Sequence, residues 1–162
     1  MLDRVTEYAQ RVVSGEVVCG SLHKLACKRH LDDLKRQNTP EFPYYWNVEK
    51  ANDIIEFAET LTIAEGEEPK PVKLIPSQVF DLGCTFGWLK TSNHKRRFRR
   101  RYKSVARQNG KTFENGIMGT YFLSKSACIK STIYCDSDLS RSFALSFAKS
   151  FRALSHIIFI CA

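Results

Sequence analysis

The sequence predicts an α/β fold in which a helical N-terminal region is followed by a strand, a loop and a further helix. Two observations support this prediction. Apolar residues recur at helical spacing through the first 64 residues, and farther along a run of β-forming residues leads into a Gly-Lys-Thr turn. The 162 residues are 43% hydrophobic and 26% charged, which is typical of a globular domain.

Three helices are expected in the N-terminal region, residues 1–64. Apolar spacing predicts them over Leu2–Val13, Ser21–Gln37 and Val48–Leu61. Pro43 keeps the aromatic stretch 42–46 out of helix, and these aromatic residues suit either a packing corner or a base-stacking platform. The packing corner is the favoured interpretation.

A charged, proline-containing linker over residues 65–71 is expected to separate this region from the next, residues 72–122. Pro76 suits an early helix position and is followed by apolar residues at helical spacing. Phe98–Ala106 carries β-forming residues and predicts a strand, and Thr112–Leu123 predicts a helix.

The loop Val105–Thr112 reads Val-Ala-Arg-Gln-Asn-Gly-Lys-Thr, a phosphate-binding pattern whose opening glycine is replaced by valine. Lys111 could contact the β- and γ-phosphates of a nucleotide, and the Thr112 hydroxyl could ligate Mg²⁺. Gly-Lys-Thr also occurs in ordinary loops, but the predicted order of strand, loop and helix favours phosphate binding.

The net charge of +8 is concentrated in one segment, which we call the basic segment. Between Lys95 and Lys103 there are seven basic residues and no acidic one, so the rest of the chain carries only +1. Such a segment suits a nucleic-acid backbone, a nucleotide phosphate or a nuclear import signal. A solvated basic loop is the alternative.

Cys19, His23, Cys27 and His30 follow one another at spacings that offer zinc two sulfur and two nitrogen ligands. A single helix cannot easily surround a tetrahedral ion, so small core residues are the favoured interpretation of these cysteines. Six irregularly spaced cysteines without a signal-like N-terminus favour reduced thiols in a cytoplasm. The longest apolar run, Ile157–Ala162, is far shorter than the roughly 20 residues that span a bilayer, so no membrane association is expected.

Several of these segments together resemble the large subunit of the tailed-phage terminase, the motor that packages viral DNA. Val105–Thr112 is similar to the family's divergent Walker A loop, and the resemblance covers roughly residues 8 to 121 in the expected order. The other segments that carry it are Ala26–Leu34, Leu74–Gln78 with the following Phe86–Trp88, and the basic run Arg96–Ser104.

The resemblance implies an incomplete ATPase domain of the additional-strand P-loop type, which uses ATP and Mg²⁺. It implies that Lys111 and Thr112 hold phosphate and Mg²⁺, that Arg107 approaches the γ-phosphate, and that Gln78 hydrogen-bonds the adenine edge. An amide suits that edge because it offers both a donor and an acceptor. The remaining residues of the expected ATP site are Gln108, Asn109 and Gly110. An exposed helix glutamine is the alternative interpretation of Gln78.

The partners that the resemblance implies are double-stranded viral DNA, the small terminase subunit, the portal protein and further copies of the chain in the intact motor. All of these would be met in the bacterial host cytoplasm. The expected DNA-binding residues are Lys95, Arg96, Arg97, Arg99, Arg100 and Arg101.

From about Phe122 the resemblance is expected to end, and residues 123–162 form an atypical tail with nine serines and no glutamate. Neither a Walker B acid pair nor the family's C-terminal nuclease is recognisable there. Asp136 and Asp138 follow Lys111 too closely in the sequence to be the family's acid pair. We therefore expect a product truncated or frame-shifted after about residue 121, which binds nucleotide weakly and hydrolyses little. The alternatives are a basic nucleic-acid-binding module with an incidental Gly-Lys-Thr, or a remnant with neither activity.

Overall fold

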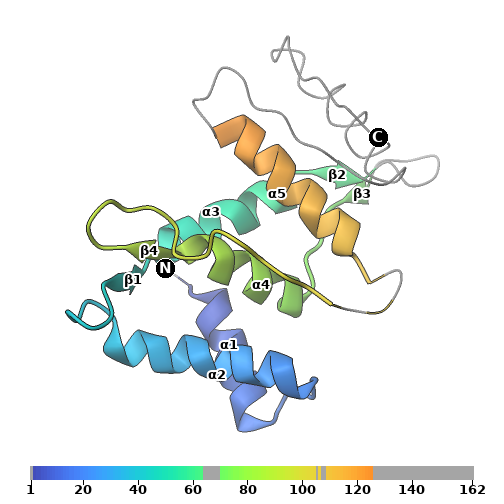
Figure 1. Cartoon of the computed structure of the whole chain (residues 1–162). Helices are drawn as coiled ribbons and strands as arrows, with labels where there is room; N and C mark the ends of the chain where they lie inside the picture. The colour runs from blue at the N-terminus through green and yellow to red at the C-terminus, as the bar shows by residue number, and fades with distance from the viewer. Residues whose placement is uncertain (1, 64–69, 105, 107–108, 126–162) are drawn as a thin grey trace. The chain divides into compact units, whose positions relative to one another are not determined.

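The computed structural model describes residues 2–63, 70–104, 106 and 109–125 (Figure 1). The chain divides into two compact units, one formed by residues 1–56 and 74–102 and the other by residues 57–73 and 103–162. The described elements are, in chain order, α1 Arg4–Ser14, α2 Ser21–Arg36, β1 Tyr44–Trp46, α3 Val48–Glu59, β2 Thr62–Ile63, β3 Lys70–Pro71, α4 Pro76–Gly87, β4 Trp88–Lys90 and α5 Lys111–Lys125.

Helix α1 has a defined start and a defined end, both encoded locally. The Asp3 carboxylate accepts the backbone N–H of Thr6 at 2.9 Å and so caps the first turn. Gly15 ends the helix with φ at 91°, a left-handed conformation that glycine adopts without strain. The buried face of α1, which includes Val5 and Val12, packs against α2 and α4 of the first unit.

Helix α4 approaches its neighbours in the first unit closely at two glycines. A Cβ on Gly83 would lie 2.3 Å from Cγ2 of Val5, and a Cβ on Gly87 would lie 2.5 Å from the Trp46 ring and 2.9 Å from Ala51. Side chains at either position would require the neighbouring elements to move apart.

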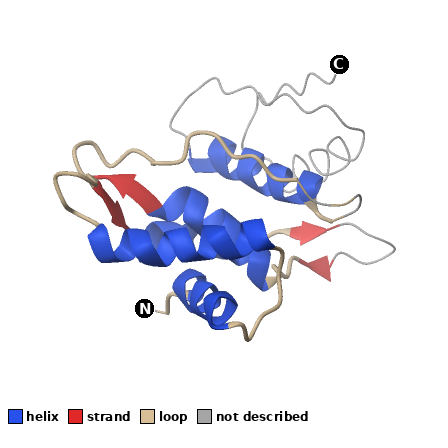
Figure 2. Cartoon of the chain, turned by 60° about the horizontal axis from the view of Figure 1, so that its bottom comes forward, coloured by secondary structure: helices blue, strands red, loops and turns tan. Residues whose placement is uncertain are grey.

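The two strand pairs of the described chain are short and antiparallel (Figure 2). In the first unit β1 pairs with β4, and the chain turns back after β4 so that Arg97 donates its N–H to the Trp88 carbonyl at 2.8 Å. In the second unit β2 pairs with β3. The predicted mixture of helices and strands is confirmed, but no parallel P-loop sheet lies within the part of the chain that is described.

The predicted helices are confirmed with bounds that differ by at most two residues, whereas the predicted strand over 98–106 is wrong. Residues 98–104 follow an irregular path. A strand requires a neighbouring strand with which it exchanges backbone hydrogen bonds. No described strand pairs with residues 98–104. Ionic side-chain contacts hold the segment instead.

The two units divide the chain differently from the predicted boundary at 65–71. Residues 74–102 fold together with the N-terminal helices, because α4 packs on α1, and Lys70–Pro71 of the expected linker form β3. None of the helices described is long and apolar enough to cross a membrane. The predicted tail, residues 123–162, lies outside the described residues from position 126 onward.

Candidate nucleotide-binding site

The Gly-Lys-Thr turn lies at the N-terminus of α5, as the phosphate-loop interpretation requires. Gly110 has φ at 71°, which favours glycine at this position, and its carbonyl accepts the N–H of Glu114 at 3.0 Å. Since α5 begins at Lys111, the backbone N–H groups of residues 111–113 belong to its first turn. A helix end of this kind attracts anions through its N–H groups and its dipole.

Four residues of the predicted ATP site, Asn109 to Thr112, lie at this helix end. Asn109 and Lys111 are exposed, and Gly110 and Thr112 are half-buried. Lys111 and Thr112 occupy the first two positions of α5. The predicted site residues Arg107 and Gln108 lie outside the described residues.

A buried ion pair lies one turn into α5. The Glu114 side chain is only 1% exposed, and its Oε1 lies 2.5 Å from Nζ of Lys103, which is itself 21% exposed. Glu114 shares the buried face of the helix with Ile117 and Tyr121, and the Tyr121 ring contacts that of Phe57 at 5.3 Å. An acid is therefore held within the first turn of the candidate phosphate-binding helix.

Gln78 lies in the first unit, at the start of α4. Its Oε1 accepts the N–H of Ile75 at 3.1 Å, so the side chain caps the helix, and the residue is 8% exposed. The alternative interpretation of Gln78 as an exposed helix glutamine is therefore wrong. Its predicted contact with adenine stays a prediction.

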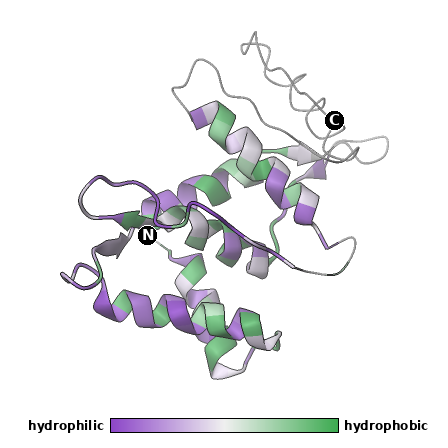
Figure 3. Cartoon of the chain, in the orientation of Figure 1, coloured by the Kyte–Doolittle hydropathy of each residue, from purple (hydrophilic) through white to green (hydrophobic). Residues whose placement is uncertain are grey.

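The basic segment is hydrophilic along most of its length (Figure 3). One of its residues, Arg97, contacts other residues of the first unit. Its Nη1 lies 2.5 Å from Oδ2 of Asp33, an acid on α2 that is 1% exposed. The Oδ1 atom of Asp33 accepts two further hydrogen bonds from Arg36. The Arg97 guanidinium also lies over the rings of Phe42 at 4.6 Å and Phe98 at 4.8 Å.

Two more arginines of the basic segment contact the first unit. Arg101 forms an ion pair with Asp81 on α4 at 3.2 Å, and Arg96 lies over the Phe86 ring at 5.0 Å. Lys95, Arg99 and Arg100 are exposed. The six predicted DNA-binding residues thus divide into three that contact the protein and three that face solvent, so the solvated-loop alternative does not describe the segment as a whole.

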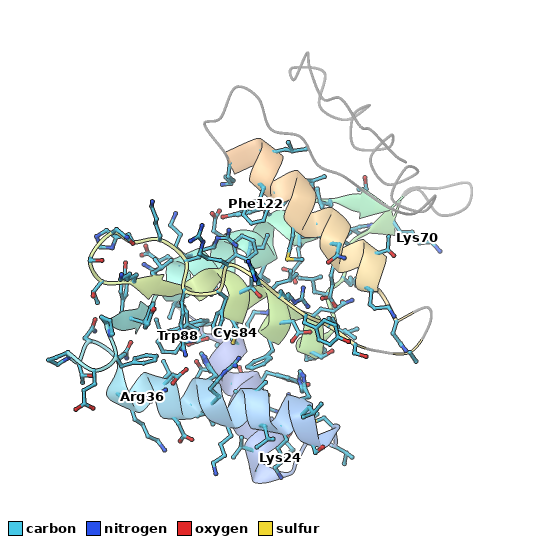
Figure 4. The ribbon with its side chains drawn as sticks, viewed as in Figure 1. Lys24, Arg36, Lys70, Cys84, Trp88 and Phe122 are labelled. Atoms are coloured by element: carbon cyan, nitrogen blue, oxygen red, sulfur yellow. The ribbon has the colours of Figure 1, made fainter. Side chains whose placement is uncertain are left out.

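The aromatic stretch 42–46 forms the predicted packing corner. Phe42 is buried against Trp88 with ring centroids 5.8 Å apart, and the Trp46 indole contacts Trp88 at 5.6 Å. Both tryptophans also donate hydrogen bonds, Trp46 to Asp3 at 2.8 Å and Trp88 to His30 at 3.1 Å. Figure 4 labels Trp88 and Cys84, which both contact His30 on α2.

His30 is neutral at physiological pH because burial lowers its pKa to about 4. A tryptophan N–H can only donate, so Nδ1 of His30 accepts it and the proton resides on Nε2. That nitrogen lies 3.0 Å from the Thr6 hydroxyl, which in turn donates to Asp3 at 2.6 Å. His30 therefore ties α2 to β4 and to the start of α1.

The other members of the Cys-His set have contacts of their own. His23 lies 3.2 Å from the Tyr8 hydroxyl, and Cys27 is fully buried, which raises the pKa of its thiol to about 12. Cys27 is thus the small core residue that was predicted, whereas Cys19 is half-exposed. Among the described residues no group of histidine, cysteine and acidic side chains has the geometry of a metal site.

The helix end behind a Gly-Lys-Thr turn defines a class of site that is suited to phosphate. Residues 76–142 match the family described as terminase large subunit, ATPase domain. This match over residues 76–142 confirms the resemblance drawn from the sequence. The match includes Gln78 and the whole loop 105–112, and it continues past Phe122, where the resemblance was expected to end. No curated protein and no solved structure matches the chain.

The ion-pairing roles of three charged residues were not predicted from the sequence. These residues are Asp33, Lys103 and Glu114. The available signal was position on a helix face. Glu114 falls at helical spacing with Ile117 and Tyr121, and a charged residue on an apolar face requires a partner. The identity of that partner depends on the path of an irregular segment, which periodicity does not reveal.

Proposed function

We propose that the chain binds Mg-ATP at the N-terminus of α5, as the ATP-binding part of a phage terminase large subunit. The observation that carries this proposal is the Gly-Lys-Thr turn, with Gly110 at positive φ and α5 beginning at Lys111, inside a segment that matches the terminase ATPase family. Each feature alone is common. Their coincidence within the matched segment supports nucleotide binding.

In this proposal the ammonium group of Lys111 contacts the β- and γ-phosphates, and the Thr112 hydroxyl ligates Mg²⁺. Backbone N–H groups of the first turn of α5 complete the phosphate contacts. Arg107 approaches the γ-phosphate, Gln108 and Asn109 line the loop, and Gln78 contacts adenine. For Gln78 to do so, its amide nitrogen would face the base while its oxygen keeps the α4 cap.

We further propose that this chain hydrolyses ATP slowly. Phosphoryl transfer to water requires an acid that helps to hold Mg²⁺ and a group that orients the water. Neither is recognisable in the sequence that follows the loop. Viral double-stranded DNA, the small terminase subunit and the portal protein are the proposed partners in the intact packaging motor.

Equilibrium titration of a fluorescent ATP analogue with Mg²⁺ tests the binding proposal. Replacing Lys111 by alanine removes a direct phosphate contact, so we expect at least about a tenfold loss of affinity. Lys125 lies in the last turn of the same helix and provides the matched control. Lys125→Ala is expected to bind within about twofold of the unaltered chain. Equal affinity in the Lys111→Ala and Lys125→Ala variants would refute the proposal.

A second candidate function is nucleic-acid binding by the basic segment without any role for the Gly-Lys-Thr turn. The exposure of Lys95, Arg99 and Arg100 favours it, since these three cations remain accessible to phosphate. Salt-dependent DNA binding that requires Arg99 and Arg100 and ignores Lys111, in a chain that does not bind ATP, would support this candidate instead.

A further inference from the structure

We propose that the solvent-facing side of the first half of α2 is a docking surface for an acidic amphipathic helix of a partner protein. This surface, which we call the α2 patch, consists of Val18, Leu22, Lys24, Leu25, Lys28 and Arg29. It belongs to the first unit, whereas α5 belongs to the second, so the inference does not depend on the proposed ATP site.

Three large apolar side chains of the α2 patch face solvent. Val18 is 96% exposed, Leu22 is 81% exposed and Leu25 is 60% exposed. Leu22 and Leu25 are three residues apart on α2, so their side chains are neighbours on one side of the helix. Val18 precedes Leu22 by four residues of chain, which span at most about 14 Å. Single exposed apolar residues are common, whereas three so close together indicate a surface for interaction.

The other side of α2 packs within the first unit. Cys27 and His30 are buried there, where α2 lies against α1. An α-helix turns by about 100° per residue, so Leu25 lies about 160° around the helix axis from Cys27. Leu22 and Leu25 therefore point away from the core, and the described elements of the first unit leave them uncovered.

The charged residues of the α2 patch all have the same sign. Between Glu16 and Asp32 the sequence contains no acidic residue. Glu16 itself forms an ion pair with Arg11 at 2.7 Å, and Asp32 forms one with Lys35 at 3.4 Å. Three cations of this stretch are exposed, and Figure 4 labels the first of them: Lys24, Lys28 and Arg29. The patch therefore joins apolar side chains to a positive surface.

An acidic amphipathic helix matches both properties of the α2 patch. Its apolar side chains, three or four residues apart, would cover Leu22 and Leu25 as in other helix-in-groove interfaces. Lys24 and Lys28 are four residues apart and so lie side by side along α2. Carboxylates at the same spacing on the partner helix would meet these two ammonium groups.

Other occupants match the α2 patch less well. A symmetric pair of copies would bring the patch against itself, and its cations would then repel one another. A nucleic acid would use the cations through its phosphates but would leave the leucines exposed. An anionic membrane suits a helix that can bury a whole apolar face, whereas α2 buries its other face in its own unit.

Fluorescence anisotropy with a labelled synthetic peptide tests the proposal. The peptide carries leucine at every third or fourth position and glutamate elsewhere, and at about 18 residues it is long enough to form a helix. We expect the unaltered chain to bind it with a dissociation constant below about 100 μM. The double variant Leu22→Ser/Leu25→Ser should lose at least about tenfold in affinity, and so should Lys24→Glu/Lys28→Glu.

Leu2→Ser and Lys50→Glu are the matched controls, because both residues are exposed in the first unit and lie outside α2. Each control should bind the peptide within about twofold of the unaltered chain. A second peptide, with lysine in place of glutamate, tests the role of charge. It should bind Lys24→Glu/Lys28→Glu more tightly than it binds the unaltered chain. Circular dichroism checks that every variant is folded.

Several results would overturn the proposal. Failure of the unaltered chain to bind the glutamate peptide would do so, as would equal affinity of the Leu22→Ser/Leu25→Ser and Leu2→Ser variants. Binding to phosphatidylglycerol vesicles or to duplex DNA in the absence of peptide binding would assign the α2 patch to a membrane or to nucleic acid instead. Self-association that Leu22→Ser/Leu25→Ser abolishes, again without peptide binding, would assign it to a second copy of the chain.

Discussion

Trp88 donates its indole N–H to Nδ1 of His30 across 3.1 Å, and this hydrogen bond joins β4 to α2 inside the first unit. The acceptor must be unprotonated, since a protonated imidazole carries a hydrogen on both nitrogens. The fold of this unit is therefore sensitive to the charge state of a residue that the zinc hypothesis had singled out for other reasons.

Acid is expected to destabilise the first unit through His30. Burial lowers the pKa of His30 from 6.5 to about 4, so between these values the unfolded chain binds a proton that the folded chain does not. The stabilising contribution of neutral His30 is complete above the unfolded pKa of 6.5 and is lost as the pH falls toward about 4, by up to about 3 kcal/mol.

Urea denaturation across this pH range measures the effect, with His30→Gln as the comparison. Glutamine cannot become protonated, so the variant should be less stable at neutral pH but should lose less stability on acidification. Parallel pH profiles for the two proteins would show that His30 does not titrate in this way.

The close approach of α4 to β1 and α3 makes Gly87 intolerant of a side chain. A methyl group there would overlap the Cβ of the buried Ala51 and the ring of Trp46, which is hydrogen-bonded to Asp3. We expect Gly87→Ala to lower the free energy of unfolding by about 1–3 kcal/mol. Gly20→Ala is the control, because nothing lies within 4 Å of a Cβ at that position. Equal stability of the two variants in chemical denaturation would contradict the packing described at Gly87.

Arg97 is expected to matter for stability rather than for DNA contact. Removing its guanidinium in Arg97→Gln leaves the buried Asp33 carboxylate with Arg36 as its remaining ion-pair partner in the structure. The side chain of Arg97 is 17% exposed, so we expect a loss of about 2–4 kcal/mol. Arg100→Gln replaces an exposed arginine of the same segment and should change stability by less than about 0.5 kcal/mol. Thermal unfolding of both variants measures the difference. An Arg97→Gln protein as stable as the unaltered chain would contradict a stabilising role for the Arg97–Asp33 ion pair.

The exposed cations of the basic segment are expected to carry any DNA binding. Replacing Arg99 and Arg100 by alanine should weaken binding to duplexes of different sequence alike, and should reduce the slope of log affinity against log salt by about 2. Fluorescence anisotropy over a series of salt concentrations measures this slope. An unchanged slope would show that these two residues do not contact phosphate.

Much of the local structure could be predicted from the sequence, because it depends on neighbours in the chain. Helical periodicity predicts α1 to α5, and the helix expected to begin at Thr112 begins one residue earlier, at Lys111. The strand predicted over 98–106 was wrong because alternation of β-forming residues is not sufficient. Instead of a neighbouring strand, that segment finds acids on two helices, Asp81 as the partner of Arg101 and Glu114 as the partner of Lys103. Such partners are distant in the chain, and periodicity carries no information about them.

Only part of the candidate site could be predicted from the sequence. The Gly-Lys-Thr turn identifies Lys111 and Thr112 from three adjacent residues and their following helix. The acid in the first turn, Glu114, and its partner Lys103 became apparent only when the folded chain showed that one carboxylate is buried. Burial of a charge depends on the whole unit, whereas the turn depends on a few residues.

Nucleotide binding at the N-terminus of α5 can be tested by following backbone amide resonances of the isotope-labelled chain while Mg-ATP is added. We expect the largest shifts at the turn and the first positions of α5, namely Gly110, Lys111, Thr112 and Phe113, and we expect Lys111→Ala largely to abolish them. Shifts confined to the exposed residues of the basic segment, with the amides of 110–113 unchanged, would contradict nucleotide binding at this helix end.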